Sequence, residues 1–294
     1  CLSSCGGGKK YKVGIIQQAP HVALDAATEG FKKALIDKLG EENVQFEFQN
    51  AGGETTACST IAANFIAKKM DLVMQAMAGA TTTIPVLGTS ITEYGVALGL
   101  KDFNGVTGIN VSGTSDLAPL NEQAQMILDL FPETKKVGLL YCSAEPNSEY
   151  QVKVVKEYLE AKGITCTNYS FSDSNDIIAV TTAAADNSDV IYVPTDNKAA
   201  ECKETIGSIV SLKKVPVIAG EEGICSGCGV AAFSISYYEI GYKTGEMAAA
   251  ILKGEAKVDE MPIAYDPNPV KKYNKTFCEE LGIPAPEGYV AIGD

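Results

Sequence analysis

The chain has no tryptophan, a single histidine (His21) and a shortage of basic residues. One histidine excludes a metal site built from several histidines. The 24 Lys and Arg are outnumbered by 37 Asp and Glu, which leaves a net charge of -13 and argues against nucleic-acid binding, since that requires clustered basic side chains. After residue 10, no apolar run approaches the ~20 residues needed to span a bilayer. The sequence therefore predicts a globular protein without membrane-spanning helices.

Motifs of common catalytic and nucleotide sites are absent as well. His21 precedes Asp25 by four residues, but a Ser-His-Asp hydrolase also needs a nucleophile on a strained turn such as G-x-S-x-G, which the chain lacks. Neither a G-x-x-x-x-G-K-S/T phosphate loop nor a G-x-G-x-x-G turn after a strand is found. The sequence thus favours a protein that is not an enzyme and has no cofactor, with any nucleotide belonging to a partner.

The first ten residues have the pattern of a processed export signal. Residues 2–5, Leu-Ser-Ser-Cys, have the form of a lipobox, and three glycines and two lysines then lead to the first apolar run at Tyr11. We expect residues 1–10 to be a lipidated tether, with Cys5 acylated or, as the alternative, Cys1. An ordinary flexible terminus with two incidental cysteines is the competing interpretation.

The chain has nine cysteines, some of which could pair in an oxidising compartment. Cys142 ends one predicted strand and Cys166 lies in the next, so the two could be neighbours. Cys225-Ser-Gly-Cys228 is a CxxC motif, but it precedes a strand-like segment, whereas a thioredoxin-type motif opens a helix. A structural or free pair is therefore favoured over an extracellular thiol enzyme that uses Cys225 and Cys228.

Apolar runs bounded by Gly, Pro or Asn alternate with helical patterns along the chain. Strands alternating with helices imply βαβ units, and therefore parallel sheets covered on both faces. Phe31 and Leu35 lie on one face of a predicted helix, and Ser148 with Gln151 forms a capping box at the start of another. The predicted strands are 12–16, 44–48, 71–75, 84–87, 136–141, 164–169, 189–193 and 215–219.

The two halves of the chain resemble each other. Lys-Val-Gly-Ile-Ile at 12–16 recurs as Lys-Val-Gly-Leu-Leu at 136–140, and two further matches follow in the same order. Ordered matches at similar offsets predict two copies of one α/β unit. Ligands of parallel sheets bind beyond the carboxyl ends of the strands, so two such lobes would face each other across a cleft.

The predicted strand ends are rich in small polar residues. Helix starts beside them could bind an anion and nearby carboxylates a cation, a combination that suits a zwitterion. The same residue types are, however, what turns and helix N-caps require. The residues are Gln17, Gln18, His21, 78–82, Thr89, Ser90, Thr92 and Glu93 in the first half, and Ser143, Glu145, Asn147, Ser148, 195–197, Glu221, Glu222 and Ser234 in the second.

Three stretches, 21–31, 191–197 and 235–241 running into 244–248, resemble the substrate-binding lipoproteins of ABC importers, in the TrpX-like subgroup that takes up tryptophan, tyrosine or phenylalanine. The resemblance covers nearly the whole chain from Tyr11. It implies an α/β, type I periplasmic-binding-protein fold, with two similar doubly wound parallel-sheet lobes and a three-strand hinge. The N-terminal lobe would comprise 11–112 and 236–262, and the C-terminal lobe 113–235 and 263–294.

The same resemblance implies where the chain would pass between the lobes. The crossings would lie near Val111 to Ser115, near Ser234 to Ser236 and near Pro262. The helix over 237–252 would then pack on the first lobe. Closure of the lobes on a ligand would be a hinge motion.

The resemblance also implies a role. The protein would capture an amino acid of the aromatic class in the interlobe cleft and deliver it to an ABC permease and its ATPase, acting as a monomer anchored to the outer face of the cytoplasmic membrane. Ser143, Asn147 and Ser148 would lie near the ligand carboxylate and Asp196 and Glu221 near its ammonium. Gln17, His21 and Thr92 would line the first lobe, and Thr81, Thr195 and Asn197 complete the predicted ligand-binding set. A sensing module for a membrane receptor is the alternative.

Overall fold

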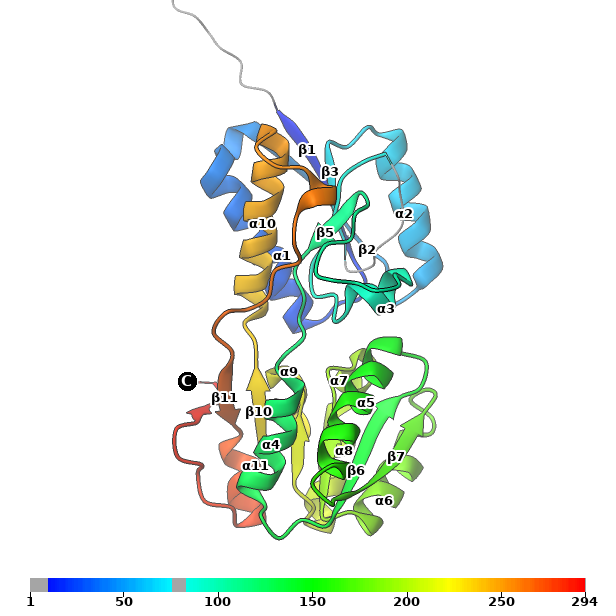
Figure 1. Cartoon of the computed structure of the whole chain (residues 1–294), viewed down its shortest axis with the longest axis vertical. Helices are drawn as coiled ribbons and strands as arrows, with labels where there is room; N and C mark the ends of the chain where they lie inside the picture. The colour runs from blue at the N-terminus through cyan, green and yellow to red at the C-terminus, as the bar shows by residue number, and fades with distance from the viewer. Residues whose placement is uncertain (1–9, 76–82, 294) are drawn as a thin grey trace, which may run out of the picture. The chain divides into compact units, whose positions relative to one another are not determined.

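A computed structural model describes residues 10–75 and 83–293. The chain folds into two compact units (Figure 1). Unit 1 is formed by the residues up to Leu117 together with Ser236–Asp266, and unit 2 by Ala118–Ile235 together with the residues from Pro267 onward. The two candidate lipidation sites, Cys1 and Cys5, lie outside the described residues. Among the described residues, no helix combines the length and the hydropathy of a membrane span.

Unit 1 is built on a five-stranded sheet in the order β2-β1-β3-β4-β5, and its strand pairs are parallel. The strands are β1 (Tyr11–Gln17), β2 (Val44–Asn50), β3 (Leu72–Gln75), β4 (Val86–Gly88) and β5 (Val111–Gly113). The helices are α1 (Val22–Leu39), α2 (Thr55–Ala67), α3 (Tyr94–Leu98) and α10 (Tyr237–Lys253), with short 3-10 turns η1 (Glu41–Asn43) and η2 (Val258–Glu260).

Helices cover both faces of this sheet. Phe31 and Leu35 of α1 and Met247 of α10 pack with the strand side chains of one face. On the other face, the Phe65 ring of α2 lies over Gly14, where an added Cβ would be 2.4 Å from the ring. The helices α1 and α10 run side by side (Figure 1), which confirms the prediction that the helix after residue 236 packs on the first lobe.

Unit 2 contains a seven-stranded sheet in the order β12-β11-β10-β9-β8-β6-β7, parallel except for the antiparallel pair β10–β11. Its strands are β6 (Lys136–Cys142), β7 (Thr165–Phe171), β8 (Val190–Val193), β9 (Val217–Ala219), β10 (Ala231–Ser234), β11 (Val270–Tyr273) and β12 (Val290–Ala291). Its helices are α4 (Leu120–Leu130), α5 (Pro146–Glu160), α6 (Ile177–Asn187), α7 (Asn197–Glu201), α8 (Lys203–Lys213), α9 (Glu222–Cys228) and α11 (Lys275–Leu281).

The internal repeat is confirmed by the strand order. The sequence β2-β1-β3-β4 in unit 1 corresponds to β7-β6-β8-β9 in unit 2. Even a hydrogen bond recurs: the Lys12 backbone N–H donates to Asp71 Oδ2 over 2.8 Å, and the Lys136 N–H donates to Asp189 Oδ2 over 2.8 Å. The matched segments therefore occupy matched positions in two copies of one α/β unit.

The boundaries between the units differ by a few residues from those expected. The first boundary follows Leu117 rather than residue 112, and the third follows Asp266 rather than residue 262. The reason is that β5 pairs with β4 in unit 1, and the Ser115 backbone N–H then donates to Ala264 O over 2.8 Å. These contacts hold both segments in unit 1 beyond the predicted crossing points.

Two local predictions were wrong. Cys142 and Cys166 are not neighbours: β6 and β7 are parallel, so Cys142 at the end of β6 pairs with Phe171, and Cys166 pairs with Val137. Ser148 does not cap a helix with Gln151, because α5 already begins at Pro146 with Glu145 at the N-cap position. Proline suits the first position of a helix, since its missing N–H would have no partner there.

Candidate functional site

The carboxyl ends of β6, β8 and β9 lie along one edge of the unit 2 sheet, because these strands are parallel neighbours. The segments after them are 143–148, 195–197 and the region of Glu221. The sheet therefore brings together the residues of the second half that the sequence predicted at the strand ends. Their hydrogen bonds show what each side chain does in this unit.

Asp196 is buried and connects two elements of this edge. Its Oδ1 accepts a hydrogen bond from the Ala199 N–H over 2.7 Å, which caps α7. Its Oδ2 accepts from the Cys142 N–H over 2.7 Å, at the end of β6. Burial, with a smaller contribution from the negative charge of Glu145, raises the pKa of Asp196 to about 6. Both oxygens of this carboxyl group thus bind backbone N–H groups of the protein itself.

Glu145 completes the capping of α7. Its carboxylate accepts hydrogen bonds from the Asn197 N–H (3.0 Å), the Asn197 side-chain amide (2.8 Å) and the Lys198 N–H (2.9 Å). The N–H groups of a first helical turn attract an anion. Here two carboxylates of the chain bind them, so the start of α7 is already neutralised from within.

The carbonyl of Thr195 joins the loop before α7 to helix α5. It accepts hydrogen bonds from the side-chain amides of Asn147 over 3.2 Å and Gln151 over 2.9 Å, and from the Ser148 hydroxyl over 3.5 Å. The Gln151 side chain in turn accepts from the Thr195 N–H over 3.0 Å. The Ser143 hydroxyl, which is exposed, donates to Phe171 O over 3.2 Å. Asn147, Ser148 and Thr195 therefore form one connected group.

Glu221 is the N-cap of α9. Its two oxygens accept hydrogen bonds from the Gly223 and Ile224 N–H groups. Burial is the main reason that its pKa is raised. The two carboxylates that the resemblance placed near a ligand ammonium, Asp196 and Glu221, thus both act as helix caps in unit 2. Their direct contact with a ligand stays a prediction.

In unit 1, Gln17 and His21 lie where β1 leads into α1. The Gln17 amide donates to Ala19 O over 2.9 Å and to Asp25 Oδ1 over 2.7 Å, and its oxygen accepts from the Thr28 hydroxyl over 3.0 Å. His21 Nδ1 accepts from the Ala23 N–H over 3.1 Å and so caps α1. Both side chains fix the start of α1, and their contact with a ligand stays a prediction. Thr81 lies outside the described residues.

Thr92, a predicted site residue, lies beside the carboxyl group of Asp116, which was not among the predicted site residues. Asp116 is buried, and the Tyr237 hydroxyl donates to its Oδ2 over 3.2 Å. Burial raises the pKa of Asp116, while hydrogen bonds from the Thr92 and Tyr237 side chains oppose this rise. Asp116 follows β5, a strand of only three residues. In the sequence, the position of Asp116 is indicated only by its place as an acidic residue shortly after a short apolar segment.

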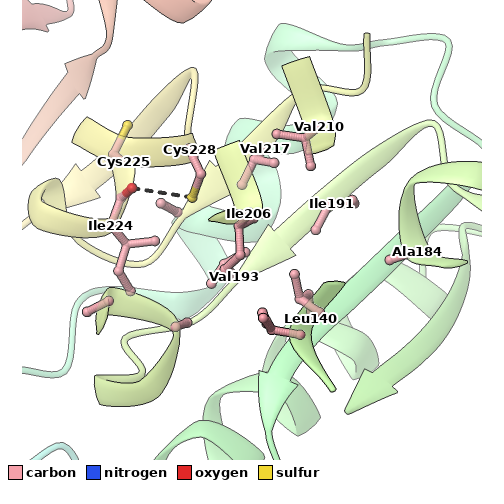
Figure 2. Close-up of a cluster of buried hydrophobic side chains, with 14 of the residues drawn as sticks. Leu140, Ala184, Ile191, Val193, Ile206, Val210, Val217, Ile224, Cys225 and Cys228 are labelled. Atoms are coloured by element: carbon pink, nitrogen blue, oxygen red, sulfur yellow. Dashed lines mark hydrogen bonds between the residues drawn. The ribbon is translucent and has the colours of Figure 1, made fainter. Parts of the chain in front are cut away.

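The CxxC cysteines belong to the core of unit 2. Cys225 and Cys228 lie in α9 among the side chains of Ile206, Val217 and Ile224 (Figure 2). The Cys228 thiol donates to Ile224 O over 3.3 Å, and all seven described cysteines are free thiols. Among the described residues, no group of three or more His, Cys, Asp or Glu side chains is placed to hold a metal ion.

This burial leads to a prediction about thiol reactivity. In the native protein, Cys225 and Cys228 should resist alkylation by iodoacetamide, because both are 0% exposed and burial raises the pKa of both thiols. The half-buried Cys202 should react first among the described cysteines. Mass-spectrometric mapping before and after unfolding in urea measures this order. Rapid native labelling of Cys225 would contradict the packing of α9.

The fold and the sequence both match known proteins. The fold is that of type I periplasmic binding proteins. Solved structures of low sequence identity share it, among them a sugar-binding protein from Bacillus halodurans (16% identity, TM-score 0.67). The sequence profile of the ABC transporter substrate binding protein family matches residues 12–292. The chain belongs to this family.

Individual relatives are similar over most of their length. The tyrosine-binding protein of Clostridioides difficile (strain R20291) is 33% identical over 264 residues, which cover 87% of this chain and 76% of the relative. A Streptococcus pneumoniae ABC domain solved with L-Trp is 30% identical, with a TM-score of 0.88 over 95% of this chain and 97% of that one. A ligand-free, open substrate binding protein with adhesive properties from Clostridium difficile is 35% identical, with a TM-score of 0.77 over 96% and 99%.

Membership in this family has direct consequences. ABC transporter substrate-binding proteins work outside the cytoplasm, where they bind a solute for import. They are in general not enzymes. Both statements agree with the predictions made from the sequence.

Proposed function

We propose that this protein is the binding component of an ABC importer for an aromatic amino acid, which it delivers to the permease and its ATPase. The observation that carries the proposal is its similarity to two relatives described by aromatic amino acids, one as a tyrosine-binding protein and one solved with L-Trp. Both similarities extend over most of this chain. Family membership favours transport over the alternative of a receptor-linked sensor.

The residues proposed to contact the ligand lie at the carboxyl ends of strands in both units. Because the chain contains no arginine, no guanidinium group can bind a ligand carboxylate, which leaves hydroxyl, amide, backbone N–H and lysine ammonium donors. Ser143, Asn147 and Ser148 carry hydroxyl and amide donors at the unit 2 edge, and to bind the ligand they would exchange their present carbonyl acceptors for its carboxylate. Asn147 is half-buried and Ser143 exposed, which leaves them accessible to a solute.

We also propose a lipid anchor at the N-terminus. Residues 1–10 would tether the protein to the outer face of the cytoplasmic membrane through a lipid on Cys5, or on Cys1. A single copy of the chain would serve the permease. Labelling with a radioactive fatty acid in cells, compared between Cys5→Ala and Cys1→Ala variants, identifies the acylated thiol.

A thermal-shift screen tests the proposed ligand class. L-Tyr, L-Trp or L-Phe at a hundred times its Kd should stabilise the protein by about 2.7 kcal/mol, because a ligand that binds only the folded state shifts the folding equilibrium. Since the chain has no tryptophan, bound L-Trp can also be followed by its own fluorescence without tryptophan emission from the protein.

Rhamnose and myo-inositol are the matched controls, because proteins of the same fold have been solved with these solutes. Neither should raise the melting temperature. Stabilisation by a sugar, with none by the three aromatic amino acids, would contradict the proposed ligand class.

A further inference from the structure

Three buried polar atoms without hydrogen-bond partners gather at one edge of unit 1. They are Thr89 Oγ1, Ser90 Oγ and Asp116 Oδ1, and none has a partner among the described residues. Thr89 and Ser90 directly follow β4, and Asp116 follows β5. The two strands are parallel neighbours in which Gly88 pairs with Gly113, so the three residues lie at the same carboxyl edge.

Such a cluster is unusual, because burying a polar atom without a hydrogen bond costs about 1–3 kcal/mol, and more for a charged group. The described residues contain two other atoms of this kind, the hydroxyls of Thr134 and Thr181, and both belong to unit 2. Among the described residues of unit 2, no carboxyl oxygen is buried without a partner beside these two hydroxyls. This edge of unit 1 therefore gathers three polar oxygens for which the contacts of residues 10–75 and 83–293 provide no partner.

The surrounding chain holds these acceptors in place. The Tyr237 hydroxyl donates to Asp116 Oδ2 over 3.2 Å, and the Ser115 hydroxyl donates to Thr92 O over 2.7 Å while accepting from the Leu117 N–H over 3.0 Å. Ser90 has a φ of 62°, a left-handed conformation that is uncommon for residues other than glycine. Backbone conformations of this kind are concentrated at ligand sites.

We propose that Asp116, Thr89 and Ser90 bind the α-ammonium group of the amino acid, with Asp116 Oδ1 as its charged partner. An ammonium group has three N–H donors and no acceptor, and this edge offers three oxygen atoms that accept no hydrogen bond from the described residues. In contrast, both oxygens of Asp196 and of Glu221 already accept backbone hydrogen bonds. This inference rests on the proposed function and deepens it.

Isothermal titration calorimetry with two probes tests the assignment. The probes are L-tyrosine and 3-(4-hydroxyphenyl)propionate, which differ only in the amino group. The wild-type protein should prefer L-tyrosine strongly. In Asp116→Asn, L-tyrosine should bind about 10- to 100-fold more weakly, as for the loss of a charge-assisted hydrogen bond, while the amine-free analogue should bind as before.

Stability measurements separate a ligand role from a structural one. Thr89→Val removes a buried hydroxyl that has no partner in the described part of the chain, so it should raise the melting temperature of the ligand-free protein while weakening L-tyrosine binding. Thr181→Val is the matched control: its hydroxyl is equally buried and without a partner, and its replacement should raise the melting temperature with no change in affinity. Asparagine keeps an acceptor for Tyr237, so Asp116→Asn should also fold.

The outcomes are distinct. If the wild-type protein binds L-tyrosine and Asp116→Asn binds both probes as the wild type does, the ammonium assignment is wrong and the proposed function stands. If the wild-type protein binds no amino acid, both fail. Loss of affinity for both probes alike in Asp116→Asn would also overturn the assignment, since it would show a general effect on the site.

Discussion

The Gly241→Ala variant is expected to lose about 3 kcal/mol of unfolding free energy, at the upper end of the usual cost of overpacking. A Cβ at Gly241 in α10 would lie 2.0 Å from the backbone oxygen of Ala27 in α1. A Cβ at Gly30 in α1 would meet the Tyr238 oxygen at 2.1 Å. Because the obstacles are backbone atoms, no side chain can rotate away, and the helices would have to separate.

Thermal unfolding followed by circular dichroism measures the effect. A loss of this size corresponds to a fall in melting temperature of roughly 6–12 °C for a unit of about 150 residues. Alanine is a better helix former than glycine by about 1 kcal/mol, which works against the loss and makes the test conservative. Lys243→Ala, an exposed change on the same helix, should stay within about 0.5 kcal/mol of the wild type. Equal melting of Gly241→Ala and the wild type would contradict the close packing of α1 on α10.

The Asp196→Ala variant is expected to lose about 2–4 kcal/mol, because a lost N-cap costs about 1 kcal/mol and a buried N–H left without a partner costs about 1–3 kcal/mol. The two N–H groups that lose their acceptor are those of Ala199 and Cys142. Urea unfolding at pH 4 measures this difference. A loss below about 0.5 kcal/mol, the range of ordinary surface changes, would exclude the capping role.

The same variant should show a characteristic dependence on pH. The pKa of Asp196 is raised from 3.8 to about 6 in the folded protein, so the folded state binds a proton that the unfolded state has already released. The stabilisation from this proton is complete below about pH 4 and is lost as the pH rises through about 6. The difference in unfolding free energy between the wild type and Asp196→Ala should therefore shrink between these pH values.

Asp189 provides a control with the opposite sign. Hydrogen bonds from the Lys135 and Lys136 N–H groups lower its pKa, so the stabilisation it contributes is present above its unfolded pKa and is lost as the pH falls through the lower folded value. The difference between the wild type and Asp189→Asn should shrink as the solution is acidified. A difference for Asp196→Ala that stays constant from pH 4 to 6 would show that Asp196 does not titrate in this range.

Long, strongly apolar strands could be predicted because their signal is local. The predicted strand over 12–16 is part of β1, and that over 136–141 is part of β6. The short strands β5, β11 and β12, of two to four residues, carry no such signal, since they exist through pairing with distant neighbours. Asp116 was missed for this reason, because its position depends on β5.

The strand ends illustrate the same limit at the site. A run of Ser, Asn, Asp and Glu after a strand predicts polar groups at a sheet edge, and the sheet of unit 2 does gather Asn147, Ser148 and Asp196 there. The residue types do not distinguish a helix cap from a ligand contact, because both require the same oxygen atoms. Only the hydrogen-bond partners show that Asp196 and Glu221 cap helices.

By itself, the sequence determined the fold class, the duplication and the kind of protein, because apolar periodicity and ordered motifs depend on residues close together in the chain. Only the tertiary structure decided which buried polar atoms have hydrogen-bond partners within the protein, because those partners are distant in sequence, as Tyr237 is from Asp116. The polar oxygens at the edge of β4 and β5 are distinguished from those of Asp196 and Glu221 only by the lack of a hydrogen-bond partner among the described residues.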